Sequence, residues 1–286
     1  MSYRIGFLGP EATFTHLAVS TFFHSQNIQI PYATIPACMD AVADGDVDFA
    51  IVPLENAIEG SVNLTVDYLV HEQPLHIVGE LVVPISQHFM VHPDRAGAWE
   101  KVERIVSHSH AIAQCHRYLH QQFPSAEHSH AASTGAAAQY VSSHPEENAG
   151  VIANEMAAEV YGLSIVKRDI HDYSYNHTLF AILHPAMDEK PPTLPGYEAK
   201  DKTTVMVTLP SNQSGTLHQV LSAFSWRKLN MSKIESRPMK TGLGNYFFII
   251  DLEHAMDSVL IPGAVNELEA LGCGVKILGS YKAFYA

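Results

Sequence analysis

The sequence predicts an α/β fold in which a large domain built on mainly parallel sheets precedes a small βαββαβ domain. Through roughly the first 180 residues, short apolar runs alternate with amphipathic helical segments, a pattern typical of strands and helices around a parallel sheet. Apolar residues make up 47% of the 286 residues and charged residues 16%, so the chain can bury a sizeable core. This length holds one large domain or two ordinary ones.

The elements of the large domain follow from hydrophobic spacing. Short runs rich in apolar residues predict strands at 3–8, 30–34, 48–52, 76–90, 103–107, 126–130, 149–153, 164–168 and 178–184. Apolar residues at helical spacing predict helices at 13–23, 36–44, 62–70, 111–123, 134–141 and 153–161. A long mixed stretch at 81–93 separates two sets of these units, so we expect two lobes with a cleft.

A change of composition near residue 185 marks the domain boundary. The segment 184–202 is rich in proline and charge, so neither a strand nor a helix should continue through it. We therefore expect a large domain at 1–185, a linker at 186–201 and a small domain at 202–286. The last part reads as strand, helix, strand, strand, helix and strand, a ferredoxin-like order.

The charge balance narrows the classes of partner. With 17 basic and 30 acidic residues the formal net charge is −13, which opposes binding to nucleic acid or to an anionic membrane. The three cysteines, Cys38, Cys115 and Cys273, are scattered and odd in number, so a reducing cytoplasm is the simplest location. We expect no export signal and no membrane-spanning segment. An anionic substrate would depend on backbone N–H groups, helix N-termini or a few side chains.

Polar motifs follow the predicted strands, where ligands of such sheets bind. The GPEAT segment at 9–13 could present the free N–H groups of a helix start, or it could be an ordinary capped turn. Asn56 follows an apolar strand and its amide could hold hydroxyl and carboxylate groups, unless the loop only caps the next helix.

Two further motifs suit an anion at a helix N-terminus. Ser107 leaves a strand and Gln114 lies in the helix that follows it. Ser133 and Thr134 begin a helix whose next residues, Gly135 and Ala136, are small enough to let a ligand approach the N–H groups. Capping by itself also accounts for Ser and Thr at such positions.

Histidines cluster near one predicted helix and raise the question of a zinc site: His108, His110 and His116, with Cys115. No closed spacing of four ligands appears, and 18 histidines in the chain make local clusters common by chance. We expect no metal.

An Asn-His-Thr run stands directly before an apolar strand and places Thr178 at its rim. A hydroxyl there can donate a proton within a hydrogen-bonded network, or Thr178 can simply begin the strand as a β-branched residue. In the small domain, Glu235, Ser236 and Arg237 could hold an amino acid, or could belong to an ordinary edge strand.

Taken together and in this order, six motifs resemble the monofunctional prephenate dehydratase family: GPEATFTHLA, VPLENAIEGSVN, SHSHAIAQC, STGAAA, NHT-x-F and ESRP. The resemblance covers essentially the whole chain. It implies a bilobal catalytic domain like the periplasmic binding proteins, followed by a regulatory ACT domain. The family converts prephenate to phenylpyruvate, water and carbon dioxide in phenylalanine biosynthesis and needs no cofactor, so the resemblance implies a carbon–oxygen lyase.

The resemblance also implies roles for individual residues. Thr178 becomes the catalytic hydroxyl, the general acid that assists departure of the ring hydroxyl. Substrate-binding roles are implied for Asn56, Ser107, Gln114, Ser133, Thr134 and Phe180. L-phenylalanine is implied as an allosteric inhibitor at the subunit interface of a homodimer or homotetramer, held by Gly215, Thr216, Leu217, Asn230, Glu235, Ser236, Arg237 and Pro238.

One position departs from the family pattern, because Leu179 stands where the family has Arg in a Thr-Arg-Phe element. If that Arg held a substrate carboxylate, its loss removes an interaction worth roughly 1.5–3 kcal/mol. Alternatively the Arg is structural, or Lys167, Arg168 or His177 compensates. Two other functions stay open: a weakened or inactive homologue that senses phenylalanine, and a non-aromatising prephenate decarboxylase.

Overall fold

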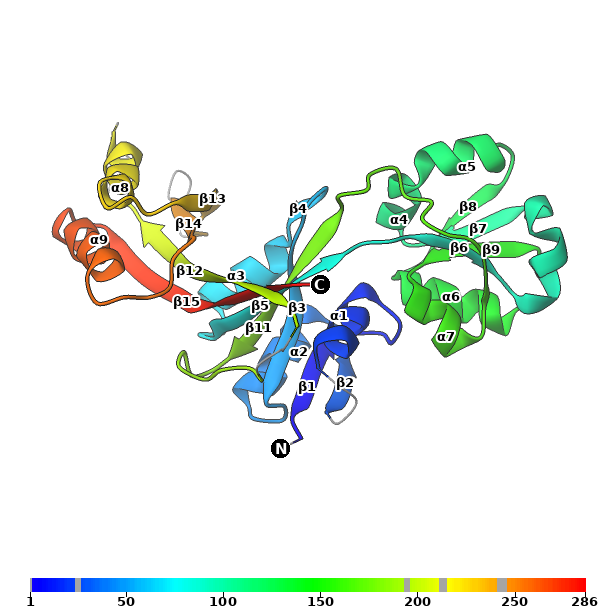
Figure 1. The fold of residues 1–286 in the computed structure, drawn as a ribbon, viewed down its shortest axis with the longest axis horizontal. Helices are drawn as coiled ribbons and strands as arrows, with labels where there is room; N and C mark the ends of the chain where they lie inside the picture. Colours follow the sequence, from blue (N-terminus) through cyan, green and yellow to red (C-terminus); the bar gives the residue numbers. More distant parts are fainter. Residues whose placement is uncertain (1, 24–26, 193–195, 211–214, 241–245) are drawn as a thin grey trace. The chain divides into compact units, whose positions relative to one another are not determined.

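The computed structural model describes residues 2–23, 27–192, 196–210, 215–240 and 246–286, and its contacts divide the chain into two compact units (Figure 1). The larger unit comprises the chain up to Gln73, residues 82–180 and Ala286. The smaller unit comprises residues 74–81 and 181–285. Strands β5 (His76–Pro84) and β11 (His177–His184) pass from one unit into the other.

The first sheet of the larger unit has the strand order β11, β3, β1, β2. Its other strands are β1 (Arg4–Leu8), β2 (Ile28–Tyr32), β3 (Phe49–Asn56) and the two-residue β4 (Gly60–Ser61). The helices between them are α1 (Phe14–Phe22), α2 (Ile35–Ala43) and α3 (Asn63–His71). Strand β1 pairs in parallel with both β2 and β3, as alternating strands and helices predict.

The second sheet has the order β10, β6, β9, β7, β8. Its strands are β6 (His88–Val91), β7 (Arg104–Ser107), β8 (Glu127–His130), β9 (Ala149–Ala153) and β10 (Ser164–Lys167). The helical segments are η1, a 3-10 helix (Pro93–Lys101), α4 (Ser109–Gln114), α5 (His116–Gln122), α6 (Thr134–Ser143) and α7 (Glu155–Tyr161).

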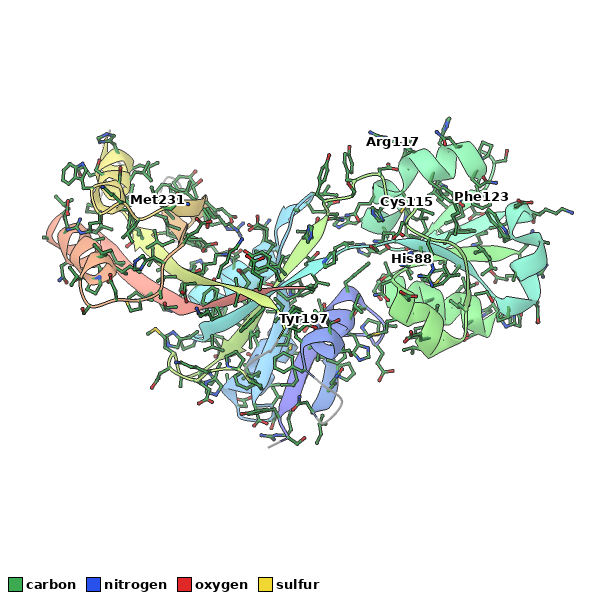
Figure 2. All side chains as sticks on the ribbon, viewed as in Figure 1. His88, Cys115, Arg117, Phe123, Tyr197 and Met231 are labelled. Atoms are coloured by element: carbon green, nitrogen blue, oxygen red, sulfur yellow. The ribbon has the colours of Figure 1, made fainter. Side chains whose placement is uncertain are left out.

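Both faces of this sheet are buried, because successive side chains of a strand point to opposite faces and each face packs against helices. Phe89 and Val91 of β6 belong to the apolar cluster that contains residues of α4 and α5, whereas Met90 belongs to the cluster of α6 and α7. Figure 2 marks Cys115 and Phe123 within the first of these clusters. Burial raises the pKa of the Cys115 thiol, which therefore stays protonated and packs as an apolar group.

The smaller unit contains a sheet in the order β13, β14, β12, β15 with antiparallel neighbours. Its elements are β12 (Glu198–Thr208), α8 (Thr216–Ser225), β13 (Met231–Pro238), β14 (Tyr246–Leu252), α9 (Leu260–Ala270) and β15 (Gly274–Tyr285). The two helices and one face of the sheet share an apolar cluster that includes Val205, Phe224 and Ile250. The order of elements is the predicted βαββαβ.

Several predicted boundaries were wrong. The segment 76–90 forms two strands instead of one, because Pro84 lacks the N–H that would continue the ladder. The helix predicted at 111–123 begins at Ser109 and is interrupted at Cys115. Near the break, backbone groups of the helix form hydrogen bonds with Asp172 instead of with the helix itself. There the Asp172 N–H donates to the Gln114 carbonyl at 2.7 Å, and the Asp172 carboxylate accepts from the Arg117 N–H at 3.2 Å.

The segment 184–202 was expected to exclude strands, and this expectation was wrong at its C-terminal end. Strand β11 ends at His184, as the predicted strand 178–184 does, but β12 begins at Glu198, within the segment predicted as a linker at 186–201. Charged residues are tolerated in β12 because they lie at its exposed end, where Glu198 pairs with Tyr285 of β15. Among the described residues, no helix is both long and apolar enough to cross a membrane.

A buried ionic cluster lies within the smaller unit. The Lys202 ammonium contacts both Glu80 oxygens, at 3.0 and 3.1 Å, and the Asp251 carboxylate at 2.8 Å. The Glu80 side chain is 1% exposed and that of Lys202 is 12% exposed. Burial by itself would lower the pKa of Lys202, but the two carboxylates outweigh it and raise that pKa, so the ammonium stays charged.

Candidate active site

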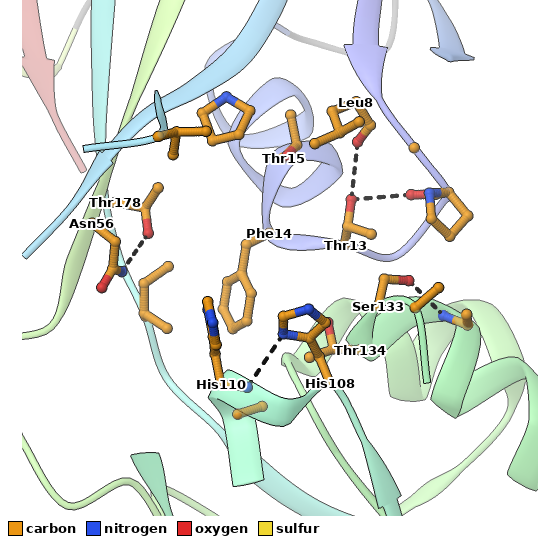
Figure 3. Close-up of a pocket in the computed structure, with 18 of the residues that line it drawn as sticks. Leu8, Thr13, Phe14, Thr15, Asn56, His108, His110, Ser133, Thr134 and Thr178 are labelled. Carbon is orange, nitrogen blue, oxygen red and sulfur yellow. Dashed lines mark hydrogen bonds between the residues drawn. The ribbon is translucent and has the colours of Figure 1, made fainter. Parts of the chain in front are cut away.

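A pocket of about 1110 Å³ lies within the larger unit, lined by residues that follow strands of both of its sheets (Figure 3). The carboxyl ends of β1 and β3 contribute Leu8 and Asn56, and β11 contributes Thr178 and Phe180. The first residues of α1, α4 and α6 complete the wall. This is the edge at which open α/β sheets bind ligands, and the volume suits a small organic molecule.

The Asn56 side chain has only one orientation that satisfies its neighbours. Its Oδ1 accepts from two backbone N–H groups, those of Ile58 at 3.0 Å and Glu59 at 3.1 Å. Backbone N–H groups can only donate, so the amide nitrogen must face the other way. There Nδ2 donates to the Thr178 hydroxyl oxygen at 2.9 Å, a bond drawn in Figure 3.

Strand alternation decides which residues of β11 reach the pocket. Thr178 and Phe180 line it, with exposed fractions of 8% and 2%. Successive side chains of a strand point to opposite faces, so Leu179 faces away, and it is not among the described residues that line the pocket. The side chain of an Arg at this position would therefore begin on the face of β11 opposite the pocket.

Two helix N-termini open into the pocket. Thr13 caps α1 by accepting from the His16 N–H, and Ser133 caps α6 by accepting from the Ala136 N–H at 3.0 Å. Both caps line the pocket together with Thr134 (Figure 3). Helix starts carry partial positive charge and free N–H groups, which favour an anionic ligand.

The small residue after Thr134 has a different role from the predicted one. A Cβ on Gly135 would collide with the Glu11 carbonyl oxygen, so the glycine is required for close packing of α6 against the loop that precedes α1. The Asn154 amide also donates to the Ala12 carbonyl in this loop, at 3.1 Å. The loop at 9–13 is thus held by residues of the second sheet and its helices.

The structure does not bring Ser107 to the pocket, contrary to its predicted role. Ser107 is fully buried in β7, and its hydroxyl donates to the Ile152 carbonyl of β9 at 2.6 Å. Its position at a strand end suggested an anion site, but the paired strand already satisfies this hydroxyl. Gln114 does line the pocket, where it is 7% exposed.

Sequence reasoning missed Asn176 as part of the site. Its Oδ1 accepts from Asn56 Nδ2 at 3.0 Å, and its Nδ2 donates to Gln114 Oε1 at 3.1 Å. Asn176 is 2% exposed and lies behind the residues that line the pocket. The Asn-His-Thr run signalled this region, but only the fold reveals that Asn176 meets residues 120 and 62 positions away.

The pocket has few charged side chains. Among the described residues that line it, Glu11 and Glu59 are acidic, and none is Lys or Arg. His108 and His110 are the only described lining side chains of a type that can become cationic. Their rings pack edge to face, with the ring centroids 4.9 Å apart. Burial, reinforced by His110, lowers the pKa of His108, so His108 is largely neutral at neutral pH.

No group of three or more His, Cys, Asp or Glu side chains in the described ranges is arranged to hold a metal ion. His108 instead caps α4, with its Nδ1 accepting from the His110 N–H. Cys115, which the sequence places beside these histidines, is fully buried in the core of the second sheet.

Comparison with known families agrees with this geometry. Residues 5–188 match the model of the family described as prephenate dehydratase. The chain belongs to the prephenate dehydratase family. The matched region contains every residue that lines the pocket, and membership places the chain among the lyases.

Curated members of the family match almost end to end. The prephenate dehydratase of Bacillus subtilis (strain 168) is 62% identical over 282 residues, 98% of this chain and 99% of the relative. That of Lactococcus lactis subsp. cremoris (strain MG1363) is 39% identical over 98% of both chains. These relatives carry both the matched region and the part of the chain that follows it.

Solved structures show the same fold. Prephenate dehydratase from Arthrobacter aurescens in complex with L-Phe has a TM-score of 0.83 and 32% identity, covering 97% of this chain and 89% of that one. The enzyme from Staphylococcus aureus has a TM-score of 0.81 and 27% identity over 97% and 99%. GqqA, described as a novel type of quorum quenching acylase, also has a TM-score of 0.83, with 26% identity over 98% of both chains.

The predicted regulatory residues of this family member lie in the smaller unit. Gly215 caps α8 with a φ of 92°, a left-handed conformation that glycine adopts without strain. Glu235 and Arg237 share one face of β13 and form an ion pair at 3.5 Å, while Ser236 points to the other face. The other predicted regulatory residues lie on α8 or β13 or directly beside β13: Thr216, Leu217, Asn230 and Pro238.

Proposed function

We propose that the pocket converts prephenate to phenylpyruvate, water and carbon dioxide, with Thr178 as the general acid. The observation that carries this proposal is the hydrogen bond from Asn56 Nδ2 to the Thr178 oxygen. Because this oxygen accepts from Asn56, its own hydrogen is left to donate to a group in the pocket. A hydroxyl poised as a donor is what departure of a ring hydroxyl requires.

The reaction is an elimination across the ring. The bond between the ring carbon and its carboxylate breaks, and the electron pair of that bond moves through the ring as it becomes aromatic. The carbon–oxygen bond at the opposite ring carbon breaks, and the departing hydroxide takes the Thr178 proton to become water. A proton from solvent restores Thr178, so that the prephenate dianion and one proton give phenylpyruvate, carbon dioxide and water.

A threonine suffices as the acid because aromatisation supplies a large driving force. The N–H of Asn56 favours the transient alkoxide of Thr178, since hydrogen bonds strengthen as the acceptor gains charge. The same bond holds the hydroxyl in one place, so less orientation has to be achieved in the transition state.

The opposite wall binds the anionic groups. The N-termini of α1 and α6, with Ser133 and Thr134, hold a substrate carboxylate through N–H and hydroxyl donors. The ring lies against Phe180, and removing the departing carboxylate from water favours its loss as neutral carbon dioxide. Gln114 orients the substrate from α4.

Regulation belongs to the C-terminal part of the chain. L-phenylalanine binds at the interface between smaller units of a homodimer or homotetramer, at the residues from Gly215 to Leu217, at Asn230 and from Glu235 to Pro238. The L-Phe complex of the Arthrobacter aurescens enzyme supports this assignment. Binding inhibits the enzyme if phenylalanine favours one arrangement of the chain over another.

The organisation and setting of the protein follow the same proposal. Residues 1–185 form the catalytic domain, and the regulatory ACT domain begins with β12 at Glu198 instead of at residue 202. The end of the family match at residue 188 supports the first boundary. The enzyme acts in the cytoplasm on a soluble substrate, without a cofactor.

The decisive experiment incubates purified full-length protein with prephenate and identifies the product. Phenylpyruvate, read as its enolate in alkali, and inhibition of its formation by L-phenylalanine are the expected results. A decarboxylated product that is not aromatic would replace the proposal with a decarboxylase. Absence of any turnover, with retained phenylalanine binding, would make the chain a sensor. The fold shared with GqqA makes identification of the product necessary.

A further inference from the structure

We infer that Asn176 is a positioning residue that sets the direction of a hydrogen-bond relay, so that Gln114 offers an N–H group to the substrate and Asn56 offers one to Thr178. This inference rests on the proposed dehydratase function and assigns a role to a residue outside the pocket lining. Asn176 touches neither the substrate site nor the reacting atoms, and acts through the two amides beside it.

The direction of the relay begins at the backbone. The N–H groups of Ile58 and Glu59 fix Asn56 Oδ1 as an acceptor, so Asn56 Nδ2 must donate. That nitrogen donates to Asn176 Oδ1 at 3.0 Å, which fixes the Asn176 amide in turn. The orientations of the Asn56 and Asn176 amides therefore follow from the backbone, because backbone N–H groups can donate but cannot accept.

The fixed Asn176 amide then orients the far wall. Its Nδ2 faces Gln114 Oε1 at 3.1 Å, so the Gln114 oxygen is occupied and its Nε2 remains for the pocket that Gln114 lines. A donor at this position suits a carboxylate or hydroxyl oxygen of the substrate. The reverse orientation would present an oxygen and repel an anion.

Asn176 also lies between a residue of the first sheet of the larger unit and a residue beside its second sheet. Its backbone carbonyl accepts from the Ile85 N–H at 2.8 Å, in the connection that leaves β5. Asn56 belongs to the first sheet, and Gln114 belongs to α4 beside the second. The buried amide of Asn176 therefore bonds to both side chains: its oxygen accepts from Asn56, and its nitrogen donates to Gln114.

The test separates acceptor from donor with two substitutions. Asn176→Asp keeps an acceptor for Asn56 but removes the donor, so Gln114 turns its nitrogen inward and shows its oxygen to the substrate. At about pH 8, where the new carboxyl is ionised, we expect KM for prephenate to rise about tenfold with kcat within about threefold of wild type. Asn176→Ala loses both functions, and we expect kcat to fall roughly 10- to 100-fold as well.

A double-substitution cycle tests whether Asn176 acts through Asn56. In an Asn56→Ala background, adding Asn176→Ala should lower kcat by less than about threefold further. Asn148→Ala is the matched control, because Asn148 donates to the Lys101 carbonyl at 2.8 Å and does not line the pocket; it should leave both constants unchanged.

Each result decides the inference. Three results would overturn the role of Asn176. The Asp and Ala substitutions could have equal effects on kcat and KM, or Asn176→Ala could keep the wild-type kcat. In the cycle, Asn176→Ala could lower kcat as much in the Asn56→Ala background as in the wild type. If Asn176→Ala does not fold, the kcat and KM of Asn176→Asp decide alone. A wild-type protein without phenylpyruvate formation overturns the proposed function itself, which is a separate result.

Discussion

Asn56 Nδ2 lies 2.9 Å from the Thr178 oxygen, although 122 positions separate the two residues in the chain. One residue ends β3 and the other lies near the start of β11, and both line the pocket. The bond gives Asn56 a more specific role than the substrate binding that its motif suggested. Asn56 determines which way the Thr178 hydroxyl can donate.

Exchanging the amide for a carboxylate should reverse this arrangement. In Asn56→Asp the carboxylate would accept from Thr178, so the hydroxyl hydrogen would no longer be available to the leaving group. We expect kcat to fall on the order of 100-fold or more, with a smaller loss for Asn56→Ala, in steady-state assays of phenylpyruvate formation. Near-normal kcat in Asn56→Asp would show that Thr178 need not donate.

Leu179 should matter little to the chemistry, because it faces away from the pocket. We expect Leu179→Arg to change kcat/KM by no more than about twofold, the range of a substitution outside the site. Leu179→Ala is the control for packing on that face. A gain of more than about tenfold in Leu179→Arg would mean that an arginine here reaches the substrate.

Removing Lys202 should strongly destabilise the fold, since it would leave Glu80 and Asp251 buried beside each other without a cation. We expect Lys202→Met to lower the free energy of unfolding by about 3–5 kcal/mol, measured by urea denaturation. Lys282→Met is the control: Lys282 pairs with Asp201, both are about half exposed, and its loss should cost at most about 1 kcal/mol.

The deficit of Lys202→Met should also depend on pH. Burial, together with the Asp251 charge, raises the pKa of Glu80 although the Lys202 charge opposes the shift, so removing Lys202 should raise this pKa further. A carboxyl with a raised pKa in the folded state favours folding below its unfolded pKa, and this contribution is lost as pH rises through the folded value. The deficit should therefore be smaller at about pH 4.5 than at about pH 8. A deficit that is constant with pH would contradict this account.

His16 should make the pocket loop sensitive to acid. Its Nδ1 accepts from the Ala12 N–H at 2.9 Å, and burial lowers its pKa despite the opposing effects of Glu11 and Gln29. A histidine with a lowered pKa in the folded state contributes stability above its unfolded value of about 6.5, and this stability is lost as pH falls through the folded value.

Replacing this titrating acceptor should therefore reduce acid sensitivity. Between about pH 7.5 and about pH 5.5, His16→Gln should lose less unfolding free energy than the wild type, because its amide oxygen still accepts and does not titrate. His120→Gln, which changes a histidine of α5, should behave like the wild type. Equal acid sensitivity in His16→Gln and the wild type would exclude His16 as the cause.

Local patterns predicted much of this molecule. Helical spacing and capping residues located α1 and α6, and the order of apolar runs predicted the βαββαβ arrangement of the smaller unit. Motifs at strand ends marked Asn56 and Thr178 as site residues before their contact was visible. Asn56 ends β3 and Thr178 lies near the start of the neighbouring β11, so these two strand ends meet at one edge of the sheet.

What the sequence could not reveal depends on partners distant in the chain. The break at Cys115 arises from Asp172, and the occupied hydroxyl of Ser107 from Ile152. Asn176 has no pattern of its own, since an asparagine before a strand resembles an ordinary turn residue. Its meaning comes from contacts with two amides on different elements.

The role of Thr178 is tested most directly by the rate of phenylpyruvate formation in Thr178→Ser and Thr178→Val, compared with the wild type under saturating prephenate. Serine keeps the hydroxyl and valine keeps the shape without it. We predict that Thr178→Ser retains activity, whereas Thr178→Val loses most of it, on the order of 100-fold or more. An active Thr178→Val would contradict general acid catalysis by this residue.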